Sequence, residues 1–298
     1  MYPSVAHKIF NAEVARAMHE FNSARAISPG ILSVAMQNPS TGSAEDYPWI
    51  GAMPMVQEWL GELTADELND YDYIIKNRDY VASVMISQNH IDDDQTGVLR
   101  TLSQQLAQRI LRHPEKLIVE AIVNGDSKTA YDGVAFFSNA SGVRKIDNLL
   151  SGNGTTLANL EADLNAALVA MAKFQDDKGE PLGIRGDTIV CPMALENGFR
   201  RLVQSTSDPT ASGGIETFNP YSGRFTVIGD PRLDSDDAND WYLMATNEPM
   251  KPLIWQMRQT ANSNMEKKAG SKQWIFSADY RGAVGYGIPH LAVKTTNT

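Results

Sequence analysis

The feature that most constrains the fold is an apolar stripe that runs from Leu99 to Ile122. Pro114 lies inside the stripe, where it either kinks a helix or begins a second one. Asn124-Gly125 suits a left-handed cap at the end of the stripe. The pattern predicts a long helical rod, bent or broken near His113. The stripe residues recur at spacings of three and four, the period of one helix face: Leu99, Leu102, Leu106, Ile110, Leu117, Ile118, Ala121 and Ile122.

The rest of the chain combines a second helix with strand-like segments. The residues from Tyr80 to Ser87 alternate between two faces, and both faces are partly apolar. We therefore expect a strand that is covered on two sides. The second helix is indicated by Leu160, Leu164, Leu168 and Met171. Together the segments predict an α+β fold with two main helices and many short, scattered strands. The shorter strands are expected at Ile189–Cys191, Phe225–Ile228, Trp241–Ala245, Leu253–Met257, Trp274–Ser277 and Ala283–Tyr286.

The first 45 residues have the pattern of an arm rather than of a core segment. A short amphipathic helix is indicated by Val5, Ile9, Ala12 and Met18. The turn-rich tract from Asn38 to Ser43 follows it. Terminal segments of this kind are usually loose unless another element docks them.

Composition narrows the class of protein. The 298 residues are 42% hydrophobic and 21% charged, enough apolar surface to exclude a disordered chain. Lys and Arg total 26 against 36 Asp and Glu, and this net charge of −10 argues against a protein that holds nucleic acid by charge. The apolar runs are too short to span a bilayer, and the N-terminus has no secretory pattern. We expect a protein of a reducing cytoplasm with no membrane partner.

The residues that could carry chemistry each have a simpler structural interpretation. Asp92-Asp93-Asp94 is better explained as a helix cap than as a cation site, since no calcium-loop spacing follows. Cys191 lies in an apolar stretch and is expected to be a buried, inert thiol. Gly282, Gly285 and Gly287 indicate close packing rather than a dinucleotide site. We therefore assign no catalytic residue, cofactor or metal ligand, and expect no enzyme.

Several segments, in order along the chain, resemble the major head subunit of Mu-like phages and prophages, a major capsid protein family. The resemblance covers the chain from about residue 45 to its end and is densest at 49–138. The segments are Trp49–Met55, Glu58–Glu62, Tyr73–Tyr80, Ile91–Asp94, His113-Pro114 and Tyr131–Ser138.

The resemblance implies the fold of tailed-phage major capsid proteins. In that fold residues 1–45 would be an N-terminal arm, and 46–91 an extended β-hairpin loop with its returning strand. Residues 92–154 would form the peripheral domain with the long spine helix, which would begin near Asp94. Residues 155–265 would be the axial domain, and 266–298 a C-terminal strand that returns to the peripheral domain.

The apolar cluster in the extended loop is the candidate site. An exposed patch of this kind is larger than monomers normally carry unless a neighbour covers it, and aromatic anchors are typical of interfaces. The alternative is that these side chains belong to the core of a compact monomer. The expected inter-subunit contacts are Trp49, Met53, Met55, Trp59, Leu60 and Tyr73.

The function implied by the resemblance is self-assembly through hexamers and pentamers into an icosahedral shell that encloses double-stranded phage DNA. Its partners would be further copies of itself, a separate scaffolding protein and a portal, with the DNA contained without sequence recognition. The protein would be part of the virion capsid, assembled in the cytoplasm of the bacterial host. Two alternatives remain open on the sequence: an encapsulin-like cargo shell, and a soluble hydrolase whose site assembles only in three dimensions.

Overall fold

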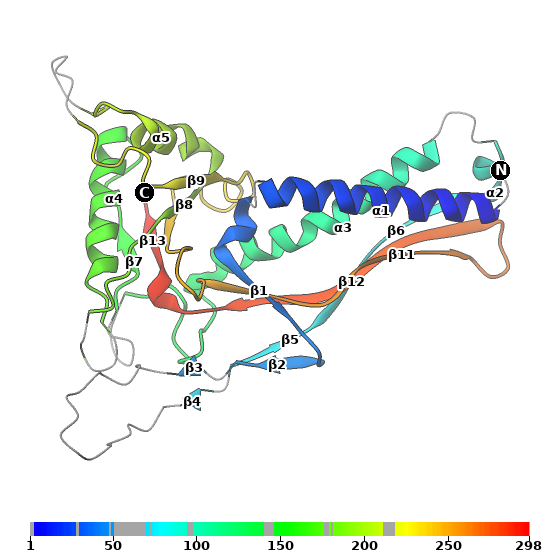
Figure 1. Cartoon of the computed structure of the whole chain (residues 1–298), viewed down its shortest axis with the longest axis horizontal. Helices are drawn as coiled ribbons and strands as arrows, with labels where there is room; N and C mark the ends of the chain where they lie inside the picture. Colours follow the sequence, from blue (N-terminus) through cyan, green and yellow to red (C-terminus); the bar gives the residue numbers. More distant parts are fainter. Residues whose placement is uncertain are drawn as a thin grey trace.

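The computed structural model combines two β-sheets with helices packed on them (Figure 1). It describes residues 3–27, 30–47, 49–50, 70–71, 73–93, 98–139, 146–175, 179, 181–210 and 218–297. The helices are α1 (Pro3–Ile27), α2 (Gln88–Asp92), α3 (Val98–Val123), α4 (Leu157–Ala172) and α5 (Met193–Gln204), with 3₁₀ turns η1 (Gly30–Val34), η2 (Asn124–Asp126) and η3 (Pro289–Leu291).

The strands form two larger and two smaller sheets. The four-stranded sheet has the order β1 (Ala35–Pro39), β11 (Leu253–Lys267), β12 (Gln273–Tyr286), β6 (Arg78–Ser87). The five-stranded sheet has the order β7 (Leu149–Ser151), β13 (Ala292–Thr296), β10 (Trp241–Met244), β8 (Thr188–Cys191), β9 (Thr226–Gly229). Two short pairs, β2 (Ala44–Asp46) with β5 (Ile74–Lys76) and β3 (Trp49–Ile50) with β4 (Asp70–Tyr71), lie on either side of residues 51–69.

The predicted helical rod is the single helix α3, and Pro114 lies inside it without ending it. The helix continues because the apolar stripe packs into the core on both sides of Pro114, with Ile110, Ile118 and Ile122 buried. Tertiary packing of an apolar face supplies most of the stability of such a helix. The possibility of two separate helices is therefore excluded.

Helix α1 corrects the expectation that residues 1–45 stand apart from the core. It lies along α3 (Figure 1) and buries Phe10 and Val14 in the same apolar cluster. The ring of Phe10 meets Phe276 of β12 edge-on, with the ring centroids 4.9 Å apart. The amphipathic pattern is therefore that of a docked helix.

The long hairpin of β11 and β12 corrects the expectation of short, scattered strands. The two strands that we expected at Trp274–Ser277 and Ala283–Tyr286 are one continuous strand, β12, and β11 extends ten residues beyond Met257. Polar residues on the exposed part of β11 hide the strand pattern, because they face solvent instead of alternating with apolar ones. Gly270, with φ of 73°, makes the turn that joins the strands.

The five-stranded sheet lies between two apolar layers. Trp241 and Leu243 point to α4 and α5, whereas Tyr242 and Met244 point to the cluster that contains α3. Strand β13 is an interior strand of this sheet, between β10 and β7, and β7 belongs to residues 92–154. Strand β11, whose residues fall mostly in the range expected for the axial domain, belongs to the sheet that packs on α3.

The close packing that we predicted at three glycines is confirmed. A Cβ atom added at Gly285 would lie 2.3 Å from Cδ1 of Ile75, and one at Gly282 would lie 2.6 Å from the carbonyl oxygen of Gln256. At Gly287 the obstacle is the carbonyl oxygen of Lys251, at 2.3 Å. Gly282 and Gly285 therefore let β12 lie close to β11 and to β5.

Candidate subunit interface

The four-stranded sheet leaves part of one face, along β6, uncovered within the described part of the chain, while Ile75 covers Ile254 and Ala283 elsewhere on that face. Helices α1 and α3 lie along the other face (Figure 1), where Val84 and Ile86 of β6 pack into the core. On the open face, Val81 is 69% exposed and Met85 is 48% exposed. The expectation that Tyr80 to Ser87 is covered on both faces is therefore wrong for the isolated subunit. Exposed apolar side chains at regular positions on a long strand are typical of a contact surface.

The outer edge of β6 adds backbone groups to this surface. Strand β6 ends the order of its sheet, and no other described strand pairs with its outer edge over ten residues. A long unpaired edge is a template for hydrogen bonds with another chain. The open face and this edge, centred on Val81 and Met85, are called the β6 surface below.

Residues 46–77 leave the four-stranded sheet and return to it. The two ends of this segment, at Glu45 and at residues 74–77, are called its root below, and hydrogen bonds hold the root against the sheet. The Glu45 carboxylate accepts hydrogen bonds from the backbone N–H groups of Thr41 and Gly42, at 2.6 and 2.8 Å, and these bonds lower its pKa. Asn77 donates to the Ser40 hydroxyl at 2.7 Å and accepts a 2.8 Å hydrogen bond from Gln256. We did not predict this network, because no spacing in the sequence connects a buried strand glutamine to a turn more than 170 residues away.

The structure describes few of the side chains that we expected at the interface. Trp49 lies in β3, with its backbone paired to Tyr71. Tyr73 packs within its own subunit, and its hydroxyl accepts a 3.0 Å hydrogen bond from the backbone N–H of Tyr286. Burial raises the pKa of Tyr73. The remaining expected contacts lie outside the described residues: Met53, Met55, Trp59 and Leu60.

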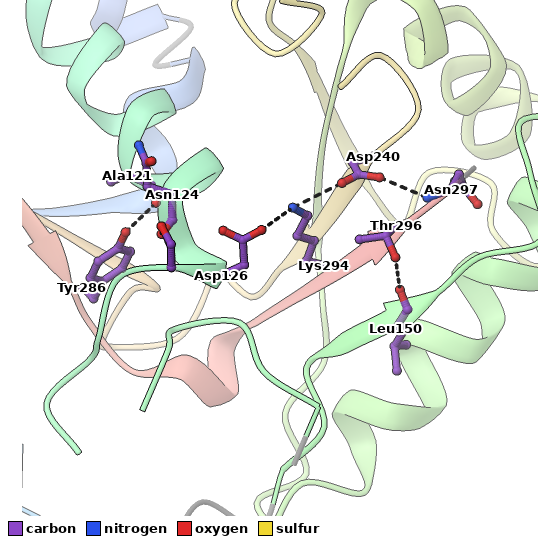
Figure 2. A network of polar contacts seen from close by, with 10 residues as sticks. Ala121, Asn124, Asp126, Leu150, Asp240, Tyr286, Lys294, Thr296 and Asn297 are labelled. Carbon is purple, nitrogen blue, oxygen red and sulfur yellow. Dashed lines mark hydrogen bonds and ion pairs between the residues drawn. The ribbon is translucent and has the colours of Figure 1, made fainter. Parts of the chain in front are cut away.

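A buried ionic joint connects the five-stranded sheet to the turn that follows α3 (Figure 2). The Lys294 ammonium of β13 lies 3.2 Å from the Asp240 carboxylate and 3.4 Å from Asp126, at the end of α3. The Lys294 and Asp240 side chains are 6% and 9% exposed. Burial raises the pKa of Asp240, and Lys294 and the backbone N–H of Asn297 oppose that shift. The joint fixes the end of α3 relative to the five-stranded sheet.

A metal-binding cluster and a reactive thiol are the two kinds of chemical site that the described residues allow us to examine. Within that part of the chain no three His, Cys, Asp or Glu side chains lie together as metal ligands would. Cys191 is buried, and burial raises the pKa of its thiol to about 12, so its thiolate is not available as a nucleophile. None of the described helices has the length and apolar character needed to cross a membrane.

Solved structures define the class of this fold. A chain in the procapsid of bacteriophage JBD30 matches with a TM-score of 0.53 and 21% identity, covering 100% of this chain and 77% of that one. A chain in a virus-like particle from Pyrococcus furiosus matches with a TM-score of 0.60 and 9% identity, covering 97% of this chain and 98% of that one. The fold is that of phage capsid proteins.

Sequence similarity then identifies the family. The chain is 23% identical to the Mu-like prophage FluMu major head subunit of Haemophilus influenzae over 259 residues, which cover 85% of this chain. It spans 61% of the length of that relative. The Mu-like prophage major head subunit gpT family matches residues 11–163, 154–233 and 230–298. The chain belongs to this family.

Proposed function

We propose that the protein is the shell-forming subunit of a phage head, and that it self-assembles through hexamers and pentamers into an icosahedral shell around double-stranded DNA. The observation that carries the proposal is the family match, which continues from residue 11 to the end of the chain. The fold supports the proposal. The match to the chain of the Pyrococcus furiosus virus-like particle covers 97% of this chain and 98% of that one.

The β6 surface suits repeated contacts between copies. Its free strand edge offers backbone hydrogen bonds, and Val81 and Met85 offer apolar area beside them. We propose that apolar side chains of a neighbouring copy cover this surface, and that Trp59 of the 46–77 segment is a separate anchor of the contact between copies. Hydrogen bonds of Glu45 and Asn77 hold the two ends of this segment in place on its own subunit.

The proposed partners are further copies of the chain, a separate scaffolding protein, a portal and the packaged DNA. The net charge of −10 favours containment of DNA without recognition, since a wall rich in Lys and Arg would bind phosphate strongly. We place assembly in the cytoplasm of the bacterial host and the finished subunit in the virion. The proposed role is structural, and a hydrolase is not favoured: the carboxylic acid Asp240, whose pKa burial raises, is paired with Lys294.

Trp59→Ala tests the proposed contact. We expect it to lower the yield of particles at least about tenfold, because a truncated aromatic anchor typically costs about 2 kcal/mol or more per contact. The thermal midpoint of the unassembled subunit should stay within about 2 °C, since a surface substitution changes stability by about 0.5 kcal/mol or less. Sedimentation velocity measures the yield, and differential scanning calorimetry measures the midpoint.

Leu182→Ala is the control for this experiment, because Leu182 is 45% exposed in the loop that follows α4, far along the chain from the 46–77 segment. It should leave both the particle yield and the midpoint unchanged. An unchanged yield for Trp59→Ala would remove this residue from the interface. A large fall in its midpoint would make Trp59 a core residue of the subunit instead.

A further inference from the structure

A groove of about 520 Å³ lies between the root of the 46–77 segment and the second half of α3. Strand β5 and the start of β6 form one side, and Leu117 and Ala121 of α3 form the other. Tyr286 contributes from β12, and its hydroxyl donates a 2.8 Å hydrogen bond to the carbonyl oxygen of Ala121. The backbone N–H of the same residue donates to Tyr73. The groove is therefore a preformed feature of the subunit, built where three elements are joined by hydrogen bonds.

The groove concentrates positive charge in an acidic protein. Lys76, Arg78 and Lys128 line it, and all three are exposed. The described part of the chain places no carboxylate within ion-pair distance of any of them. Glu120 is the acid of the lining, and its carboxylate already pairs with Lys116 at 3.4 Å. In a chain with a net charge of −10, a surface of this kind favours a negatively charged partner.

Tyrosine side chains complete the lining. Tyr73, Tyr80 and Tyr286 all face the groove. Burial raises the pKa of each hydroxyl, so all three stay neutral at physiological pH and present rings with hydroxyl groups rather than negative charge. Cations beside aromatic rings suit a peptide that carries both carboxylates and apolar side chains.

The chain itself contains a segment with the complementary composition. Between residues 46 and 75 there is no Lys, Arg or His. Apolar residues such as Trp59, Leu63 and Leu68 are interleaved with the acids. The part from 57 to 70 would span up to about 46 Å if fully extended, enough to reach an adjacent subunit. Seven acids fall in the 46–75 range: Asp46, Glu58, Glu62, Asp66, Glu67, Asp70 and Asp72.

We infer that the basic groove lined by Lys76, Arg78 and Lys128 binds the acidic segment 57–70 of a second copy of the chain. The inference rests on the proposed function, because it needs copies side by side. Copies with a net charge of −10 repel one another, so a contact that joins opposite charges selects one orientation and one register. Such a contact joins two different surfaces of each copy, which is the kind of contact that closes rings.

Complementary charge reversal tests the inference in full-length chains. The groove variant carries Lys76→Glu, Arg78→Glu and Lys128→Glu. The segment variant carries Glu58→Lys, Glu62→Lys and Glu67→Lys. A third chain carries all six changes. Each variant is assembled alone, and the groove and segment variants are also mixed in equal amounts. Native mass spectrometry measures capsomers, and circular dichroism checks that each subunit is folded.

We expect each three-residue variant alone to lose at least about tenfold in capsomer yield, because like charges then face each other at every contact. The equal mixture should recover most of the wild-type yield, since alternating copies restore opposite charges around a hexamer. The chain with six changes should recover as well. Wild-type chains that form no capsomers would instead contradict the proposed function itself.

Three results would overturn the inference while leaving the proposed function intact. The first is wild-type yield from both variants alone. The second is recovery by the six-change chain but not by the mixture, which would place the contact within one chain. The third is loss without recovery by either route. If the reversed groove prevents folding, Lys76→Gln, Arg78→Gln and Lys128→Gln replaces it, with an expected loss of about threefold or more and wild-type yield as the contradicting result.

Discussion

Replacing Lys294 by Met is expected to lower the free energy of unfolding by about 3–5 kcal/mol. The side chain is 6% exposed, and its ammonium is shared by Asp240 and Asp126. Methionine keeps most of the volume but removes the charge, so the buried Asp240 carboxylate loses its counter-ion. Urea denaturation of the unassembled subunit, followed by circular dichroism, measures the change.

The pH dependence of this loss identifies its cause. Burial already raises the pKa of Asp240 in the folded state, and removing Lys294 raises it further. A carboxyl group with a raised pKa binds more protons when folded, so the variant gains stability as pH falls through that pKa. We expect the loss to be largest at pH 7 and to shrink towards about pH 4. A loss independent of pH would assign it to packing.

Lys268→Met is the matched control for Lys294→Met. Lys268 is exposed at the turn of the long hairpin, and its replacement should change the free energy of unfolding by about 0.5 kcal/mol or less. Equal effects of the two substitutions would contradict the ionic joint.

Phe136→Ala is expected to destabilise the subunit by about 3–5 kcal/mol, the usual cost of removing a buried aromatic ring. Phe136 is 1% exposed and contacts Phe137 and Tyr286, each with a centroid separation of 4.9 Å. These contacts connect the segment after α3 to the end of β12. The same denaturation experiment measures the effect.

Phe218→Ala provides the control for Phe136→Ala, since Phe218 is 80% exposed. It should change the free energy of unfolding by about 0.5 kcal/mol or less. A loss below about 1 kcal/mol for Phe136→Ala would mean that the segment after α3 is not part of the core.

The elements that could be predicted from the sequence are those with a local period. The apolar stripe of α3 and the alternation of β6 follow from neighbouring residues alone, and both elements are present. The packing at Gly282 and Gly285 was also predictable, because a glycine inside a strand often marks the close approach of another segment. Local patterns, however, do not say which sheet a strand joins.

The elements that could not be predicted depend on contacts between distant segments. β13 pairs with β10, some fifty residues earlier in the chain. Nothing in the sequence of Ala292–Thr296 indicates which strand it pairs with. The outer part of β11 is polar, and only its pairing with β12 makes it a strand. Phe10 and Val14 join the core because α3 presents a face to them.

The candidate interface was predictable only in part. Composition and resemblance pointed to the 46–77 segment, but Tyr73, one of the expected contacts, is used within its own subunit. The open side of β6 was expected to be covered. Whether an exposed strand face is covered depends on the partner subunit, so one chain alone cannot specify it.

The central claim is that the chain forms closed shells, and the most direct test is electron microscopy of the purified protein, expressed alone and with a candidate scaffolding protein. We predict particles of uniform diameter in which averaged images resolve rings of five and six subunits. A folded chain that remains monomeric in sedimentation velocity under every condition, with no particles in the images, would contradict the claim.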